Sequence, residues 1–177
     1  MNWQILEAIS AAIAAIFTGW ILFVAWSQLK ASNAIATADF ALRFKSDFFK
    51  KETREIMMLL TENLLQFETE GDFAYFKITP FDFETKAMYS VYEVDDFLLA
   101  HLEDLGMFEE KGILDIDYIY EGFSWFIVAA FENEQIKKYI EWSRSDGEDI
   151  YEKLECIYHK VKAEEHKRSI RRKCHKA

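Results

Sequence analysis

An uncharged apolar run near the N-terminus constrains this chain more than any other feature. The run from Ala8 to Trp26 contains no charged residue and no proline, and its polar side chains are Ser10 and Thr18. A hydrocarbon core of about 30 Å is crossed by about 20 apolar helical residues. In lipid, a helix satisfies its own backbone hydrogen bonds. The run therefore predicts one transmembrane helix, and we assign this element to residues 1–30.

A buried core helix and a secretory signal peptide are the alternatives to a membrane span. A core helix would carry a polar stripe, and a signal peptide would have basic residues before a shorter apolar run. Here the N-terminal flank carries only Glu7, although Ala34-Ile35-Ala36 resembles a cleavage site. Basic residues follow the run instead, and positively charged flanks stay in the cytoplasm. They are Lys30, Arg43, Lys45, Lys50 and Lys51. We expect the N-terminus outside and the body in the cytoplasm.

Residues 31–177 predict one compact, all-helical cytoplasmic domain. One proline and six glycines in 177 residues leave few turn-forming positions. Helical spacing of apolar residues predicts a helix through residues 27–70, with a break near Ser32-Asn33 or Lys50-Lys51 as an alternative. A connector at 71–80 precedes a helix to about Leu105 that Thr79 caps, and a turn spans Gly106 to Gly112. Further helices are expected at 118–131, 135–144 and 148–172.

Two local signals refine the second half of this domain. Asp115 is placed to cap the helix at 118–131. The middle of that helix, Phe123 to Phe131, is so apolar that we expect it to form the centre of the core. In the last helix, apolar spacing predicts a buried stripe. Its members are Ile150, Leu154, Ile157 and Val161.

The net charge of −10 hides an asymmetry between the body and the C-terminus. Residues 31–159 hold 28 acidic and 12 basic residues, whereas residues 160–177 hold 2 acidic and 8 basic residues. The acidic body argues against nucleic-acid binding over the whole surface. The basic tail fits RNA, anionic lipid or the acidic body of a neighbouring chain, or it is a solvated helix end whose cations suit the helix dipole.

A stripe of small residues lies on one face of the predicted membrane helix. Its members are Ala8, Ala12, Ala15 and Gly19, at spacings of four, three and four. Small residues let membrane helices approach closely, so the stripe predicts self-association. Alanine is also common in membrane helices that do not associate. One span cannot enclose a channel, but several copies packed through this face can.

Three further groups of residues are candidates for chemistry. Arg168 and His175 are seven residues apart, so they would lie on one face of a helix. An arginine can stabilise negative charge on a phosphate, and a histidine can transfer a proton at neutral pH. Metal-free cleavage of RNA requires both functions. Cys156 and His159 could form half of a zinc site, but no second pair has suitable spacing, so we expect no metal and no cofactor. Cys156 and Cys174 both lie in the predicted cytoplasmic domain, and the cytoplasm is reducing, so we expect free thiols. The acidic pairs Asp95-Asp96, Glu103-Asp104 and Glu109-Glu110 are expected to be solvated.

One membrane helix, an acidic helical body and the Arg168–His175 pair together resemble a known family. The chain resembles the Csx family of small membrane accessory proteins, encoded beside the RNA-guided, RNA-targeting effector of type VI-B CRISPR loci. The resemblance implies a HEPN-like helical bundle and a homo-oligomeric pore, an octamer, in the bacterial inner membrane. HEPN nucleases usually carry Asn, Asp or His directly after the arginine, whereas Ser169 stands here.

The sequence and the resemblance favour a non-enzymatic pore. Opening of this pore would depolarise the inner membrane and enhance the antiphage defence of the effector. A membrane-anchored ribonuclease that uses Arg168 and His175 is the first alternative. A membrane docking module without catalysis is the second. The expected partners are further copies of the chain, the lipid bilayer and the effector, and contact with RNA stays open.

Overall fold

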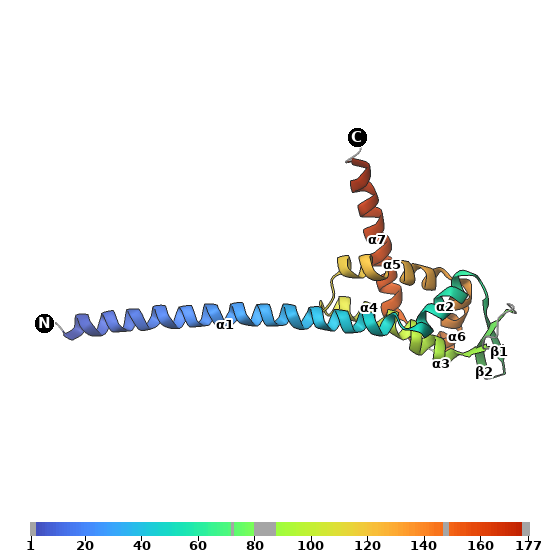
Figure 1. Cartoon of the computed structure of the whole chain (residues 1–177), viewed down its shortest axis with the longest axis horizontal. Helices are drawn as coiled ribbons and strands as arrows, with labels where there is room; N and C mark the ends of the chain where they lie inside the picture. Colours follow the sequence, from blue (N-terminus) through green and yellow to red (C-terminus); the bar gives the residue numbers. More distant parts are fainter. Residues whose placement is uncertain (1–2, 72, 80–87, 147–148, 175–177) are drawn as a thin grey trace. The chain divides into compact units, whose positions relative to one another are not determined.

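The fold is described from a computed structural model of the full chain (Figure 1). It describes residues 3–71, 73–79, 88–146 and 149–174; at residues 4–15, 146 and 174 it describes the backbone alone. The chain divides into two compact units, Met1–Arg43 and Phe44–Ala177, and each is described by itself. The described residues are mostly helical, as predicted, with one small sheet that was not predicted.

Helix α1 (Trp3–Phe48) is the longest element of the described chain. Among the described residues, no helix combines the length and the apolarity needed to cross a bilayer. The predicted span over Ala8–Trp26 falls partly on side chains outside the described residues. A break follows Phe48, near one of the two expected positions, because Lys50 is extended (φ −64°, ψ 164°) and begins α2 (Lys51–Thr61).

A three-stranded antiparallel sheet is formed by residues that were predicted to be helical or part of a connector. Its order is β1-β2-β3, formed by β1 (Leu65–Glu70), β2 (Phe73–Ile78) and β3 (Met88–Ser90). Asn63 (φ 55°) and Gly71 (φ 61°) adopt left-handed conformations that end α2 and turn the hairpin. The aromatic residues of this stretch favour strands, and here they pair across them: Phe67 lies opposite Phe76.

A continuous helical segment follows the sheet and runs through the turn predicted at Gly106. It consists of α3 (Val91–Val94), the π-helix η1 (Asp95–Leu99) and α4 (Ala100–Glu110). Ser90 caps it in a capping box with Glu93. The Thr79 N–H donates to the Leu64 carbonyl, and residues 80–87, where the helix predicted to be capped by Thr79 would begin, lie outside the described residues. Gly112 (φ 66°) lies beyond the helix end. The turn was predicted to start too early, because glycine is a helix breaker in sequence patterns and Gly106 lies inside a helix.

The last three α-helices lie close to the predicted ranges. They are α5 (Ile116–Glu132), α6 (Glu134–Ser143) and α7 (Glu152–Cys174), with a 3-10 turn, η2 (Arg144–Asp146), between α6 and α7. Asp115 Oδ1 accepts from the Tyr118 N–H at 2.6 Å, which confirms the predicted cap. The start of α7 is capped by a residue that is distant in sequence. The Glu103 carboxylate of α4 accepts hydrogen bonds from the N–H groups of Lys153 and Leu154.

The core of the second unit lies where α7 packs on α4 and α5. The Phe123 ring contacts the Phe48 ring at a centroid distance of 5.2 Å, and both side chains are buried. Of the stripe predicted on the last helix, Leu154, Ile157 and Val161 are buried, whereas Ile150 is only half-buried. The predicted core run is not buried all round, because Trp125 is 55% exposed.

Candidate functional site at Arg168

Arg168 lies near the end of α7, against the first turns of α5. The α7 helix presents its apolar stripe to α4 and α5, and this packing brings Arg168 beside Asp117 and Glu121. Glu164 precedes Arg168 by one helical turn, so their side chains meet on the same face. The site is therefore a junction of two helices that are distant in sequence.

The Arg168 guanidinium group donates hydrogen bonds to three carboxylates. Nε donates to Glu164 Oε1 at 2.9 Å, Nη1 donates to Glu121 Oε1 at 3.3 Å, and Nη2 donates to Asp117 Oδ1 at 2.5 Å. The guanidinium carbon also lies 4.4 Å from the centroid of the Tyr120 ring, in a cation–π arrangement. Arg168 thus fastens the second half of α7 to α5.

The hydrogen bonds of this cluster favour the charged forms of Glu164 and Arg168. Hydrogen bonds from Lys167 and Arg168 lower the pKa of Glu164 from its ordinary value. Hydrogen bonds to Glu164 and Asp117 raise the pKa of Arg168. The Glu164 residue is only 6% exposed, and a carboxylate buried to this extent needs such partners.

A polar hollow of about 460 Å³ opens beside the guanidinium. Its lining residues carry four cationic and two anionic side chains. They are Asp117, Glu164, Lys167, Arg168, Arg171 and Arg172. Its cations can hold an oxyanion, but a phosphate bound at Arg168 itself would have to replace carboxylates that already pair with it.

The catalytic pair expected from the sequence is only partly placed. Arg168 is engaged as described, and His175 lies outside the described residues. Sequence patterns did not predict that Arg168 contacts Asp117, Tyr120 and Glu121. Glu164, at the i−4 position, could have been found from helix periodicity. Partners on α5 could not, because only the packing of α7 brings them close.

Four members of the acidic pairs that were expected to be solvated have partners in the structure. Glu103 caps α7, and Glu109 and Glu110 pair with Lys160 and Lys153. Asp95 accepts a hydrogen bond from the Tyr151 hydroxyl at 2.5 Å. The expectation was wrong for Asp95, Glu103 and Glu109, because these side chains face α7 and the residue before it, whereas Asp96 and Glu110 are exposed as expected.

Asp95 belongs to a buried polar cluster that the sequence analysis did not single out. The hydroxyl oxygens of Tyr151 and Tyr139 are 3.1 Å apart. Burial raises the pKa of Asp95, and the hydrogen bond from Tyr151 opposes this effect. Tyr151 has a positive φ of 63°, and Asp95 begins the π-helix η1; both are uncommon backbone conformations. The cluster fixes the entry to α7.

The remaining candidate residues are placed as follows. Gly19 is helical, with nothing within 4 Å of the position where a Cβ would lie. The side chains of Ala8, Ala12 and Ala15 lie outside the described residues. Cys156 is a free, exposed cysteine. Among the described side chains, no group of three His, Cys, Asp or Glu residues could hold a metal ion.

No family model, curated protein or solved structure matches this chain.

Proposed function

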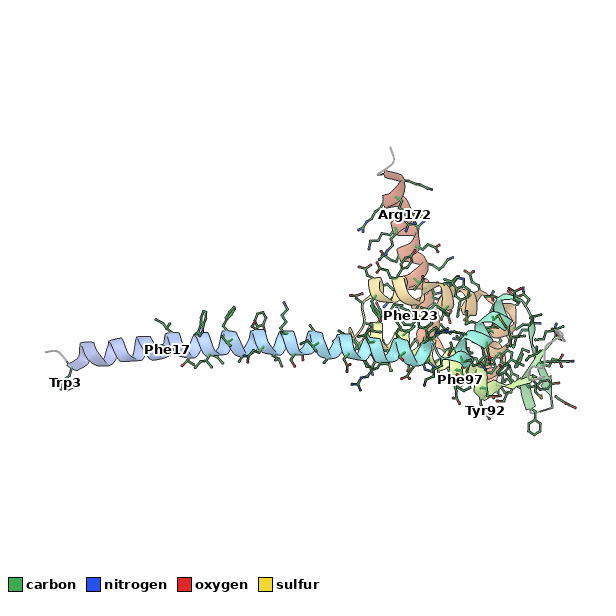
Figure 2. The ribbon with its side chains drawn as sticks, viewed as in Figure 1. Trp3, Phe17, Tyr92, Phe97, Phe123 and Arg172 are labelled. Atoms are coloured by element: carbon green, nitrogen blue, oxygen red, sulfur yellow. The ribbon has the colours of Figure 1, made fainter. Side chains whose placement is uncertain are left out.

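We propose that this chain is the protomer of a homo-oligomeric membrane pore. The observation that supports this proposal is the apolar surface of α1, whose side chains stand out around the helix at positions such as Phe17 (Figure 2). Between Ile16 and Trp26, seven large apolar residues each expose between 59% and 72% of their area. They are Ile16, Phe17, Trp20, Ile21, Leu22, Phe23 and Trp26. A continuous apolar surface of this kind has to be covered by lipid or by other helices.

Trp3, five residues before the apolar run, and Trp26, its last residue, suit a bilayer interface. Trp3 is 77% exposed and Trp26 is 60% exposed. At a rise of about 1.5 Å per residue, they lie about 35 Å apart along the helix. Lys30 Nζ lies 5.7 Å from the centroid of the Trp26 ring. Tryptophan and lysine together are typical of the boundary between hydrocarbon and water. We therefore propose that α1 is the single span, with the N-terminus outside and the second unit in the cytoplasm.

Self-association follows from the number of spans and from the small residues. One helix cannot enclose a pore, so conduction requires several copies. The open space at Gly19 leaves room for a neighbouring helix to approach the α1 backbone. An octameric ring, a HEPN-like second unit, a bacterial inner-membrane location and support of an RNA-guided effector in antiphage defence are the parts of the proposal that the family resemblance supplies.

We assign Arg168 a structural role within this protomer. Its three carboxylate partners and the Tyr120 ring already use the groups that would stabilise a phosphate. Incubation of the purified chain with RNA tests this assignment, with His175→Ala as the control. Cleavage by the wild-type chain that is lost in His175→Ala would favour the ribonuclease alternative.

Reconstitution into dye-loaded liposomes tests the pore. We expect the wild-type chain to release the dye and to have the mass of an oligomer in detergent. Gly19→Leu fills the space where helices would meet, and it should abolish release. Ala25→Leu adds a similar volume off the small-residue stripe, and it should leave release unchanged. A monomeric wild-type chain in detergent, together with impermeable liposomes, would refute the proposal.

A further inference from the structure

The cations of α7 fall into two groups according to their partners. The lysines and the arginine from Lys153 to Arg168 pair with carboxylates of the same chain, most of them on α4 and α5, whereas Lys167 pairs with Glu164 within α7. The pairs between these helices are Lys153–Glu110, Lys160–Glu109, Lys162–Glu132, Arg168–Asp117 and Arg168–Glu121. In contrast, Arg171, Arg172 and Lys173 have no carboxylate partner among the residues that the structure describes. The positive charge left for an external partner is therefore concentrated in the last turns of the helix.

These last turns also lack packing. Glu164 is the last buried residue of the described part of α7, and residues 169–173 are all exposed. Figure 1 shows the end of α7 extending past α5, and Figure 2 shows Arg172 on this segment. Ile170 is 48% exposed among the cations. Isolated short helices are marginal in water, so a solvent-exposed helical arm with an apolar residue suits a contact outside its own chain.

We propose that this arm, residues 169–173, docks on the acidic body of a second copy of the chain. The inference rests on the proposed function and names a contact that would hold the ring together. Residues 31–159 carry a net charge of −16, which complements the three cations of the arm. A ring built from identical subunits joins two different surfaces at each contact. The arm supplies one of them, and the acidic surface of the neighbouring body supplies the other.

Charge on the same chain favours a protein partner over RNA. The side chains of Asp117 and Glu121 are 68% and 71% exposed, close to the base of the arm. An RNA strand spans several nucleotides, so phosphates next to the arm would meet these carboxylates and the acidic body beyond them. The surface of a folded protein can instead place its carboxylates beside the arm without bringing negative charge next to Asp117 and Glu121.

The test compares two variants that lose the same charge. The first carries Arg171→Gln, Arg172→Gln and Lys173→Gln. The control carries Arg54→Gln, Lys111→Gln and Lys138→Gln, which are exposed cations on other parts of the second unit. The full-length chains are purified in detergent, and their mass is measured over a range of protein concentrations at low salt and at about 0.5 M salt, where charge attraction is screened.

We expect the arm variant to dissociate at a protein concentration about tenfold higher than the wild-type chain, and to show a weaker salt dependence, because it has lost the interfacial charge pairs. The control variant should match the wild type. An arm variant whose dissociation equals that of the wild type would overturn the inference and leave the pore intact. A wild-type chain that is monomeric at every concentration would instead refute the pore itself.

Two further measurements identify a different occupant of the arm. One is binding of a fluorescein-labelled oligouridylate to the solubilised chain, and the other is binding of phosphatidylglycerol in nanodiscs, with phosphatidylcholine nanodiscs as reference. If the arm variant loses either kind of binding while its dissociation stays that of the wild type, the arm serves RNA or lipid and the inference is overturned. Equal binding by both variants, with dissociation changed only in the arm variant, supports it.

Discussion

Replacement of Gly106 by alanine should destabilise the second unit, although alanine is the better helix former. Gly106 lies inside α4 and faces the backbone of α7. Of the glycines that the structure describes, it has the closest neighbours at its Cβ position. A Cβ built at this position would lie 2.2 Å from the carbonyl oxygen of Lys153 and 2.6 Å from its carbonyl carbon. Both are backbone atoms, so rotation of a side chain cannot relieve the clash.

The magnitude follows from three contributions. Ordinary contact begins at 3.4 Å, so α4 and α7 would have to move apart locally by more than an ångström. Overpacking of this kind costs about 1–3 kcal/mol. The shift also strains the hydrogen bonds from Lys153 and Leu154 to Glu103, and hydrogen bonds to charged groups contribute about 1.5–3 kcal/mol each. Higher helix propensity returns about 1 kcal/mol. We expect a net loss of about 3 kcal/mol.

Thermal unfolding of the detergent-solubilised full chain, followed by circular dichroism, measures this loss. For a chain of this size it corresponds to a fall in Tm of about 6–12 °C. Gly122→Ala is the matched control, because Gly122 also lies inside a helix and has nothing within 4 Å of its Cβ position. It should raise Tm by about 2–4 °C. Equal shifts for the two variants would refute the close approach of α4 and α7.

Two further predictions concern charged groups. Arg168→Lys should lower Tm, since lysine cannot bind three carboxylates in one plane. An unchanged Tm would contradict the role of Arg168 in holding α7 to α5. Burial raises the pKa of Asp95 in the folded chain above its value of about 4 in the unfolded chain. Ionisation of Asp95 therefore destabilises the fold as the pH rises from about 4 through the pKa of the folded state. Across that range the wild type should therefore lose stability relative to Asp95→Asn, whose amide oxygen can still accept from Tyr151. Parallel curves of Tm against pH would contradict this.

The sequence by itself determined the features that depend on neighbours along the chain. The cap at Asp115 and the buried stripe at Leu154, Ile157 and Val161 follow from side-chain type and helical spacing. The mostly helical character follows from the scarcity of glycine and proline. These signals act within a few residues, so the tertiary structure leaves them unchanged.

Only the tertiary structure decided how distant segments meet. The apolar and aromatic residues at 65–78 are compatible with helical or with strand periodicity. The pairing of β1 with β2 makes this stretch a hairpin. Gly106 looks like a turn until α7 packs against it and requires a residue without a side chain. Arg168 looks like a free cation until the same packing brings the carboxylates of α5 to its guanidinium. For Gly106 and Arg168 the deciding partner lies tens of residues away, where no local pattern can reveal it.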